Sequence, residues 1–151
     1  MHTLVRRFIK TAIAFLAAGL AIGGWMVARR ELWSRYPSSY VTSAHTHAIF
    51  VGFVMMMIMG VALWLFPRPD KEDVRYSPGA VTAAYWLLTI GTAGRVIGEL
   101  ARPVNSALWL RWAVVAASLT QIVGMLAFFY TMWSRIRPLG SRIREEKGER
   151  F

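Results

Sequence analysis

The sequence contains no cysteine and few acidic residues, and each shortage excludes a class of protein. Without cysteine there is no disulfide framework, no thiolate metal site and no cysteine-linked cofactor. Eight acidic residues stand against 18 lysines and arginines, which gives a net charge of +10. Only 17% of the residues are charged and 56% are hydrophobic, which is too apolar for an ordinary soluble domain. A length of 151 residues suffices for one domain.

The hydrophobic residues are gathered in four runs that contain no Lys, Arg, Asp or Glu, at residues 11–28, 46–66, 79–94 and 112–133. A membrane helix needs about 18–20 apolar residues, and the third run reaches that length if Arg95 is tolerated. The sequence therefore predicts an all-α membrane protein, a four-transmembrane-helix bundle. The expected helices are 8–28, 43–66, 78–100 and 106–133, within one membrane domain of residues 1–135. Thr42 or Ser43 is expected to cap the second helix, and Ser77 the third.

The positive charge lies at the ends of these runs rather than on one folded face, so a membrane surface is the expected partner and nucleic acid is not. Twelve basic residues fall on the side of the two termini, against four in the opposite connections. The positive-inside rule then places the N and C termini in the cytoplasm, with 136–151 as a basic cytoplasmic tail. We expect a multi-pass protein of a bacterial-type inner (plasma) membrane, with its first helix retained.

Ionisable residues inside the predicted spans gather in the outer half of the membrane. They are His45 and His47 on the second helix, Arg95 and Glu99 on the third, and Arg111 on the fourth. Because such residues are costly in lipid, they are the default hypothesis for a functional site. In the alternative interpretation, Arg95 and Glu99 neutralise each other at i and i+4 and only stabilise the bundle.

The two histidines are two residues apart, so on a helix they point in nearly opposite directions and cannot chelate one metal together. The face of His45 continues through Gly52 and Met56, whereas that of His47 carries only branched aliphatic residues. A nitrogen ligand beside a glycine clearance suits a flat apolar macrocycle. The methionines are typical of flexible core filling, and a histidine at a helix end is also typical of simple hydrogen bonding.

The segment His45–Phe53, HTHAIFVGF, and its continuation 60–68, GVALWLFPR, resemble the second helix of haem–copper oxidase catalytic subunits. The likeness is nearest to cbb3-type oxidases and nitric oxide reductases, and the His-x-His opening resembles short stand-alone relatives of that subunit. It covers about 24 residues and implies His45 as an axial ligand of haem b. The chain lacks the twelve helices, the late histidine pair and the copper histidines of that family. The resemblance therefore implies haem binding without oxygen reduction or proton pumping, and we do not expect a complete enzyme.

This resemblance leaves three coordination states open. The iron is five-coordinate and open to O₂, CO or NO, or takes Met125, or takes a histidine from a second subunit in a homodimer. Arg95 and Arg111 are the expected partners of the haem propionates, and His47 is expected to bond a propionate or a backbone group, or to replace His45 as ligand. The expected role is gas binding, gas sensing or electron transfer to a redox partner.

Two rival interpretations remain. One is a copper-binding or copper-transport protein that uses the His-x-His pair and the cluster Met55–Met59, because thioethers and imidazoles suit Cu(I). The other is a structural membrane subunit. Glycine pairs spaced for close helix approach, Gly19/Gly23 and Gly94/Gly98, fit packing either within one chain or across a dimer.

Overall fold

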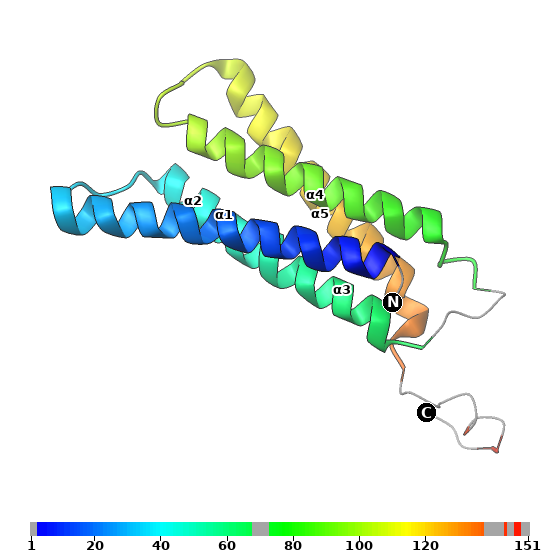
Figure 1. Cartoon of the computed structure of the whole chain (residues 1–151). Coiled ribbons are helices and arrows are strands. Elements are labelled where there is room, and N and C mark those ends of the chain that lie inside the picture. Colours follow the sequence, from blue (N-terminus) through cyan, green and yellow to red (C-terminus); the bar gives the residue numbers. More distant parts are fainter. Residues whose placement is uncertain (1–2, 68–72, 138–143, 145–146, 149–151) are drawn as a thin grey trace.

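The computed structural model describes residues 3–67, 73–137, 144 and 147–148, and in these residues every regular element is a helix (Figure 1). The elements in chain order are α1 (Thr3–Trp33), α2 (Ser39–His47), the π-helix η1 (Ala48–Met55), α3 (Met56–Leu65), α4 (Pro78–Ala101), α5 (Leu108–Met132) and the 3₁₀-helix η2 (Trp133–Arg135). Four stretches are long and apolar enough to cross a membrane: Thr3–Trp33, Ser39–Leu65, Pro78–Ala101 and Leu108–Arg135. The predicted all-α fold, with four helices long and apolar enough to cross a membrane, is therefore confirmed.

The first two helices begin earlier than predicted, because the predicted bounds followed the apolar residues alone. Helix α1 extends beyond 8–28 at both ends, because charged residues continue a helix as readily as they flank a membrane span. The second span begins at Ser39, with Ser38 as its N-cap and no side-chain cap bond, so the prediction of a cap at 42 or 43 was wrong. The cap at Ser77 is confirmed: its Oγ accepts the N–H of Ala80 at 3.0 Å.

The second span is not a regular α-helix, since η1 inserts π-helical turns directly after His47. Such turns are rare, widen the helix locally and often lie at functional sites. They also change the direction in which residues after His47 point relative to those before it. The regular period assumed from the sequence does not hold across Ala48–Met55.

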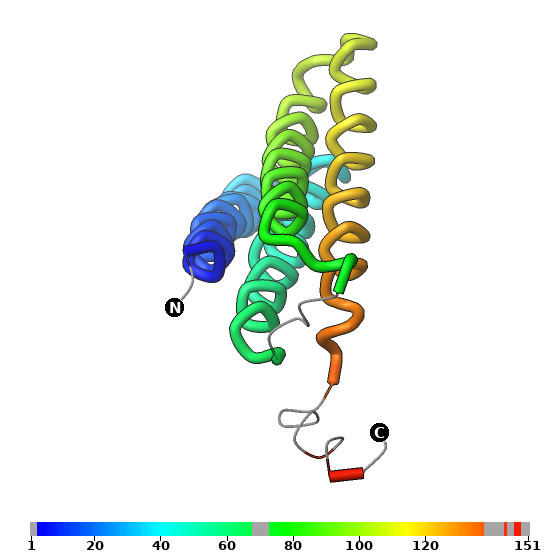
Figure 2. The backbone as a smooth tube through the Cα atoms, turned by 90° about the vertical axis from the view of Figure 1, so that its right-hand side faces the viewer, coloured from blue at the N-terminus to red at the C-terminus, as the bar shows by residue number. Residues whose placement is uncertain are grey.

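The bundle consists of two closely packed parts. Helices α4 and α5 run side by side as a hairpin (Figure 2). Their backbones touch at two glycines: a Cβ on Gly91 would lie 2.5 Å from the backbone nitrogen of Gln121, and one on Gly124 would lie 2.7 Å from that of Leu88. Helix α1 packs along α2, η1 and α3, with Gly19 and Gly23 in the contact.

Both glycine pairs singled out in the sequence thus meet neighbours within the chain. Gly94 and Gly98 face Ala117 and Val114 of α5. Close helix approach through small residues is the usual means of association in lipid, where apolar burial gives little driving force. The packing accounts for these glycines without a second subunit.

The apolar core lies in the half of the bundle near the start of α1. Phe8, Met56, Met59 and Phe128 are almost completely buried there, and the Phe8 ring meets those of Tyr85 and Phe128 edge to face at 5.0 and 5.6 Å. The distal end, which carries the turns 34–38 and 102–107, has only a small apolar cluster of Ala44, Ala48 and Val96. The buried side chains of the distal half are therefore mostly small or polar.

A buried arginine closes the other end of the bundle. Arg135 donates hydrogen bonds to the carbonyl oxygens of Leu63, Phe66 and Pro67 at 3.2, 3.1 and 2.8 Å, and its guanidinium lies 5.1 Å from the ring centre of Tyr76. The last carbonyls of a helix have no partner within it, so Arg135 of η2, the 3₁₀ turn that follows α5, caps α3.

Candidate functional site

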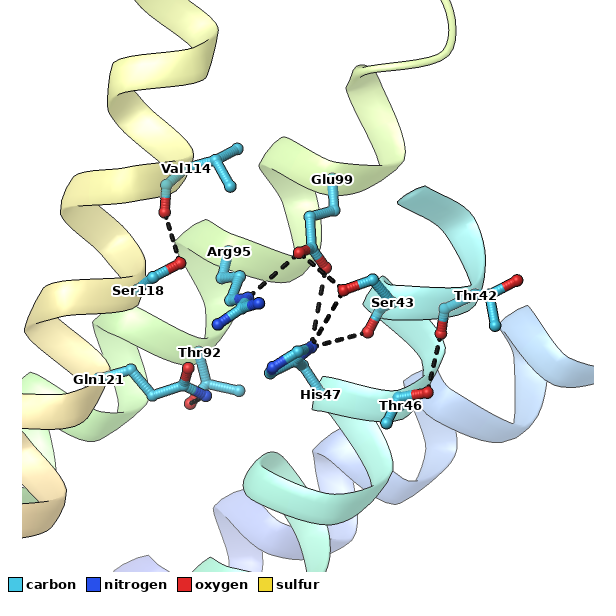
Figure 3. A network of polar contacts seen from close by, with 10 residues as sticks. All are labelled: Thr42, Ser43, Thr46, His47, Thr92, Arg95, Glu99, Val114, Ser118 and Gln121. Carbon is cyan, nitrogen blue, oxygen red and sulfur yellow. Dashed lines mark hydrogen bonds and ion pairs between the residues drawn. The ribbon is translucent and has the colours of Figure 1, made fainter. Parts of the chain in front are cut away.

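A buried carboxylate lies at the centre of a polar cluster between α2 and α4 in the distal half (Figure 3). Glu99 is only 4% exposed, and its Oε1 accepts hydrogen bonds from Ser43 Oγ at 2.8 Å and from Arg95 Nε at 3.1 Å. Arg95 lies one turn before Glu99 on the same helix, which is the i, i+4 pairing expected from the sequence. Ser43 comes from the other helix and was not predicted as a site residue.

His47 completes this cluster. Its Nδ1–H donates to the carbonyl oxygen of Ser43 at 2.9 Å, and Nδ1 lies 3.9 Å from Glu99 Oε2, a buried oxygen that has no hydrogen-bond partner in the described part of the chain. Figure 3 shows the other ring nitrogen pointing away from Glu99. The carboxylate thus has one oxygen with hydrogen-bond partners and one without, and the His47 imidazole lies 3.9 Å from the second. We call Ser43, His47, Arg95 and Glu99 the carboxylate cluster.

A second polar pair extends this layer toward α5. Gln121 Nε2 donates to Thr92 Oγ1 at 3.1 Å, and both side chains are buried. Ser118 instead bonds the carbonyl oxygen of Val114 on its own helix. Polar contacts therefore connect α2, α4 and α5 at similar depth (Figure 3).

His45 points to the opposite side of α2, as its spacing from His47 predicts. Its ring lies in the seam with α1, where Nδ1–H donates to the carbonyl oxygen of Gly19 at 2.9 Å. Gly23 makes the room, because a Cβ there would lie 2.8 Å from His45 Cε1. His45 Nε2 has no hydrogen-bond partner among the residues that the structure describes. A carbonyl oxygen that fixes one ring nitrogen and leaves the other free is the usual arrangement behind a metal-ligating histidine.

The clearance predicted at Gly52 is occupied. The ring of Phe15 from α1 lies where a Gly52 side chain would be, and the side chain of Ile49 lies in the same way against Gly19. At Gly19 the close atoms belong to the end of the Ile49 side chain, which a change of rotamer would move. At Gly52 the Phe15 Cβ itself would lie 2.6 Å from an added Cβ, so turning the ring opens this clearance only in part.

The other predicted site residues, Met56, Met125 and Arg111, take no part in the polar contacts of His45 and His47. Met56 is fully buried in the apolar core, and Met125 packs against that core. Arg111 is exposed on α5 and makes no ion pair or hydrogen bond with any described residue. Of the residues expected in the outer polar layer, Arg95 and His47 both contact Glu99, whereas Arg111 lies outside these contacts.

An all-protein metal centre has little support. Within the described ranges, no three His, Cys, Asp or Glu side chains come together in a way that could hold a metal ion. His45 and His47 lie on opposite sides of α2, and Met56 and Met59 are fully buried in the core. A macrocycle that brings four ligands of its own needs only one or two from the protein.

A family model covers almost all of the region just described, from residue 2 to residue 136. The chain belongs to the family described as a domain of unknown function, DUF8744. The matched range contains the four candidate membrane helices, His45, His47 and Arg135. No curated protein and no solved structure is significantly similar to this DUF8744 chain.

Proposed function

We propose that this DUF8744 protein binds haem b in the membrane through His45. The observation that carries the proposal is the state of the imidazole: its Nδ1–H donates to the Gly19 carbonyl oxygen, and the lone pair of Nε2 has no partner among the described residues, within a membrane-spanning segment. A polar atom without a partner is costly in lipid, so a ligand for it is favoured. The resemblance of HTHAIFVGF to the second helix of haem–copper oxidases assigns the same residue.

The residues around His45 fit haem b in chemistry. Gly19, Gly23 and Gly52 line the seam between α1 and α2–η1, and the side chains packed against them are Ile49, the His45 ring itself and Phe15, of which Ile49 and Phe15 are apolar. The Phe15 ring occupies the Gly52 clearance, so binding on this face requires that ring to turn away. Phe15 is therefore the side chain that limits access to the Gly52 side of η1.

The carboxylate cluster supports this site by positioning. Ser43 and His47 attach α2 to Glu99 of α4, and this fixes the rotation of α2 about its axis. Because His45 lies on the opposite side of α2, the same rotation sets where its ring points. Arg95 is engaged with Glu99 on the side away from His45, so its contacts favour positioning over a direct contact with a propionate.

Bound haem would supply an iron that takes a small gas ligand or exchanges electrons with a redox partner. The protein's part is to hold the iron through His45 and to surround the macrocycle with apolar helix faces. We further propose that the termini lie in the cytoplasm and the distal end faces outward, since twelve basic residues lie on the side of the termini against four in the distal connections.

The test is an absorption spectrum of the detergent-purified protein, expressed with a haem supply, in the oxidised, dithionite-reduced and CO-treated states. We expect a Soret band that is lost in His45→Ala and kept in His47→Ala, the matched imidazole on the other side of α2. Phe15→Ala should keep or raise the haem content, because it removes the ring from the Gly52 clearance and leaves only Cβ there. Wild-type protein without a Soret band would refute the proposal, and loss of haem in His47→Ala alone would move the ligand to His47.

A structural role is the second candidate, because the carboxylate cluster by itself joins α2 to α4. Metal analysis of the same variants separates the candidates. Haem lost with His45 supports the haem site, copper lost with His45 supports copper handling, and no change in either supports a structural subunit.

A further inference from the structure

Two arginines and two tryptophans form a concavity at the distal end of α1. It measures about 540 Å³ and is lined by Trp25, Arg29, Trp33 and Arg35. The first three are four residues apart on one helix and so share a face. Ser34 has a positive φ of 50°, which folds the chain back, and the N–H of Arg35 donates to the carbonyl oxygen of Arg29 at 3.2 Å. The turn thus brings Arg35 back to the end of α1, where it lines the same concavity as Arg29.

The cations in this concavity have no acidic partner. Arg29 lies over the Trp25 ring at 5.0 Å, and neither Arg29 nor Arg35 forms an ion pair with any acid in the described ranges. Arg30, in contrast, is paired with Glu31 at 2.7 Å. Two adjacent unpaired guanidinium groups are suited to a phosphate, which accepts several hydrogen bonds from each fork.

Depth in the membrane follows from the charges on α1. Residues 11–28 are free of Lys, Arg, Asp and Glu, and at about 1.5 Å per residue these 18 positions span roughly 27 Å. This nearly equals the hydrocarbon thickness of about 30 Å. Arg29 therefore lies at the boundary between hydrocarbon and headgroups, the level of lipid phosphates.

An apolar groove adjoins the concavity on its hydrocarbon side. This groove, of about 380 Å³, is lined by Ala21, Ile22, Trp25 and Leu100, so Trp25 borders both spaces. One space is cationic and at headgroup level, and the other is apolar and deeper. Together they match an amphipathic molecule with an anionic head.

We infer that this end of α1 is a binding site for an anionic phospholipid. Its phosphate would lie between Arg29 and Arg35, and an acyl chain would lie along Ala21, Ile22 and Leu100. His45 lines neither space, and the inference does not depend on haem.

The test is native mass spectrometry of the full-length protein in detergent, titrated with dioleoylphosphatidylglycerol, with phosphatidylcholine of the same chains as the zwitterionic comparison. We expect the double variant Arg29→Gln/Arg35→Gln to bind phosphatidylglycerol roughly ten-fold more weakly or worse. The matched control, Arg30→Gln/Arg111→Gln, removes the same charge and should change affinity by less than about two-fold. Equal losses in both variants would mean general charge attraction and overturn the site.

Further experiments distinguish binding of a phospholipid from binding of a free anion. Ala21→Trp fills the apolar groove and should weaken phosphatidylglycerol binding as strongly, so unchanged affinity would overturn the acyl-chain contact. Inorganic phosphate that competes with the lipid at equal affinity would likewise overturn it and leave a free-anion site. Arg35 lies outside the helix, so Arg35→Gln alone provides the same comparison if the double variant does not fold.

Discussion

Removal of the Glu99 carboxylate is the sharpest perturbation of the carboxylate cluster. The substitution Glu99→Ala breaks the 3.1 Å ion pair with Arg95 and the 2.8 Å hydrogen bond from Ser43. It leaves the Arg95 guanidinium, whose side chain is 23% exposed, without its anion in the distal half of the bundle. His47 keeps its bond to the Ser43 carbonyl oxygen and loses only its neighbour at 3.9 Å.

The expected cost follows from this geometry. Two unit charges 3.1 Å apart attract by about 5 kcal/mol at an effective dielectric constant of about 20. Desolvation of both groups offsets part of this, and breaking one partner of a buried pair costs about 3–5 kcal/mol. Partial exposure of Arg95 reduces the penalty further, so we expect Glu99→Ala to lower the free energy of unfolding by about 3 kcal/mol.

The chain provides a matched control in a second ion pair. Arg30 and Glu31 are 2.7 Å apart, but their side chains are 54% and 59% exposed. Because water screens such pairs, Glu31→Ala should cost less than about 1 kcal/mol. Both variants would be compared by equilibrium unfolding in mixed micelles, followed by far-ultraviolet circular dichroism.

A double-mutant cycle of Glu99→Ala with Arg95→Ala isolates the pair itself. We expect a coupling energy of about 1–3 kcal/mol, because the two side chains are in direct contact. If Glu99→Ala costs no more than Glu31→Ala, or if the cycle gives no coupling, the cluster does not hold α2 to α4 as its contacts indicate.

Three further predictions address the bundle, each checked by unfolding in micelles. Gly91→Leu forces a side chain into the backbone of α5 and should lower the free energy of unfolding by more than about 3 kcal/mol. At Gly24 an added Cβ meets nothing within 4 Å, so Gly24→Leu should be nearly neutral. Equal effects of the two substitutions would contradict the close contact between α4 and α5. Arg135→Ala removes three hydrogen bonds to the end of α3 and should cost about 3 kcal/mol, with lysine restoring only part of it because an ammonium lacks the guanidinium fork. The pKa of Asp73 is lowered mainly by the hydrogen bond from the Ser134 hydroxyl and next by that from a backbone N–H. These bonds therefore stabilise the folded protein above the unfolded pKa of about 3.9, and this stabilisation is lost as pH falls through the lower folded pKa. Ser134→Ala should therefore melt with a smaller dependence on pH between 5 and 3, and an unchanged dependence would contradict this.

The sequence by itself determined the number and order of the membrane-spanning helices. Runs of about 18–20 apolar residues identify such helices because lipid offers the backbone no other hydrogen-bond partner. The cap at Ser77 and the pairing of Arg95 with Glu99 were predictable for a similar reason, since both depend on residues three or four apart in one helix. The charge pattern also gave the expected orientation, which remains a prediction.

Only the tertiary structure decided what each side chain meets across the helix contacts. Ser43 as a partner of Glu99 and Phe15 at Gly52 depend on how α2 and α1 are rotated and shifted against their neighbours. Arg135 reaches α3 only because α5 ends beside it. No periodic pattern encodes these relations, because they arise from residues far apart in the chain. The π-helical turns of η1 change the direction in which the residues after His47 point, and no local sequence feature of Ala48–Met55 predicts these turns.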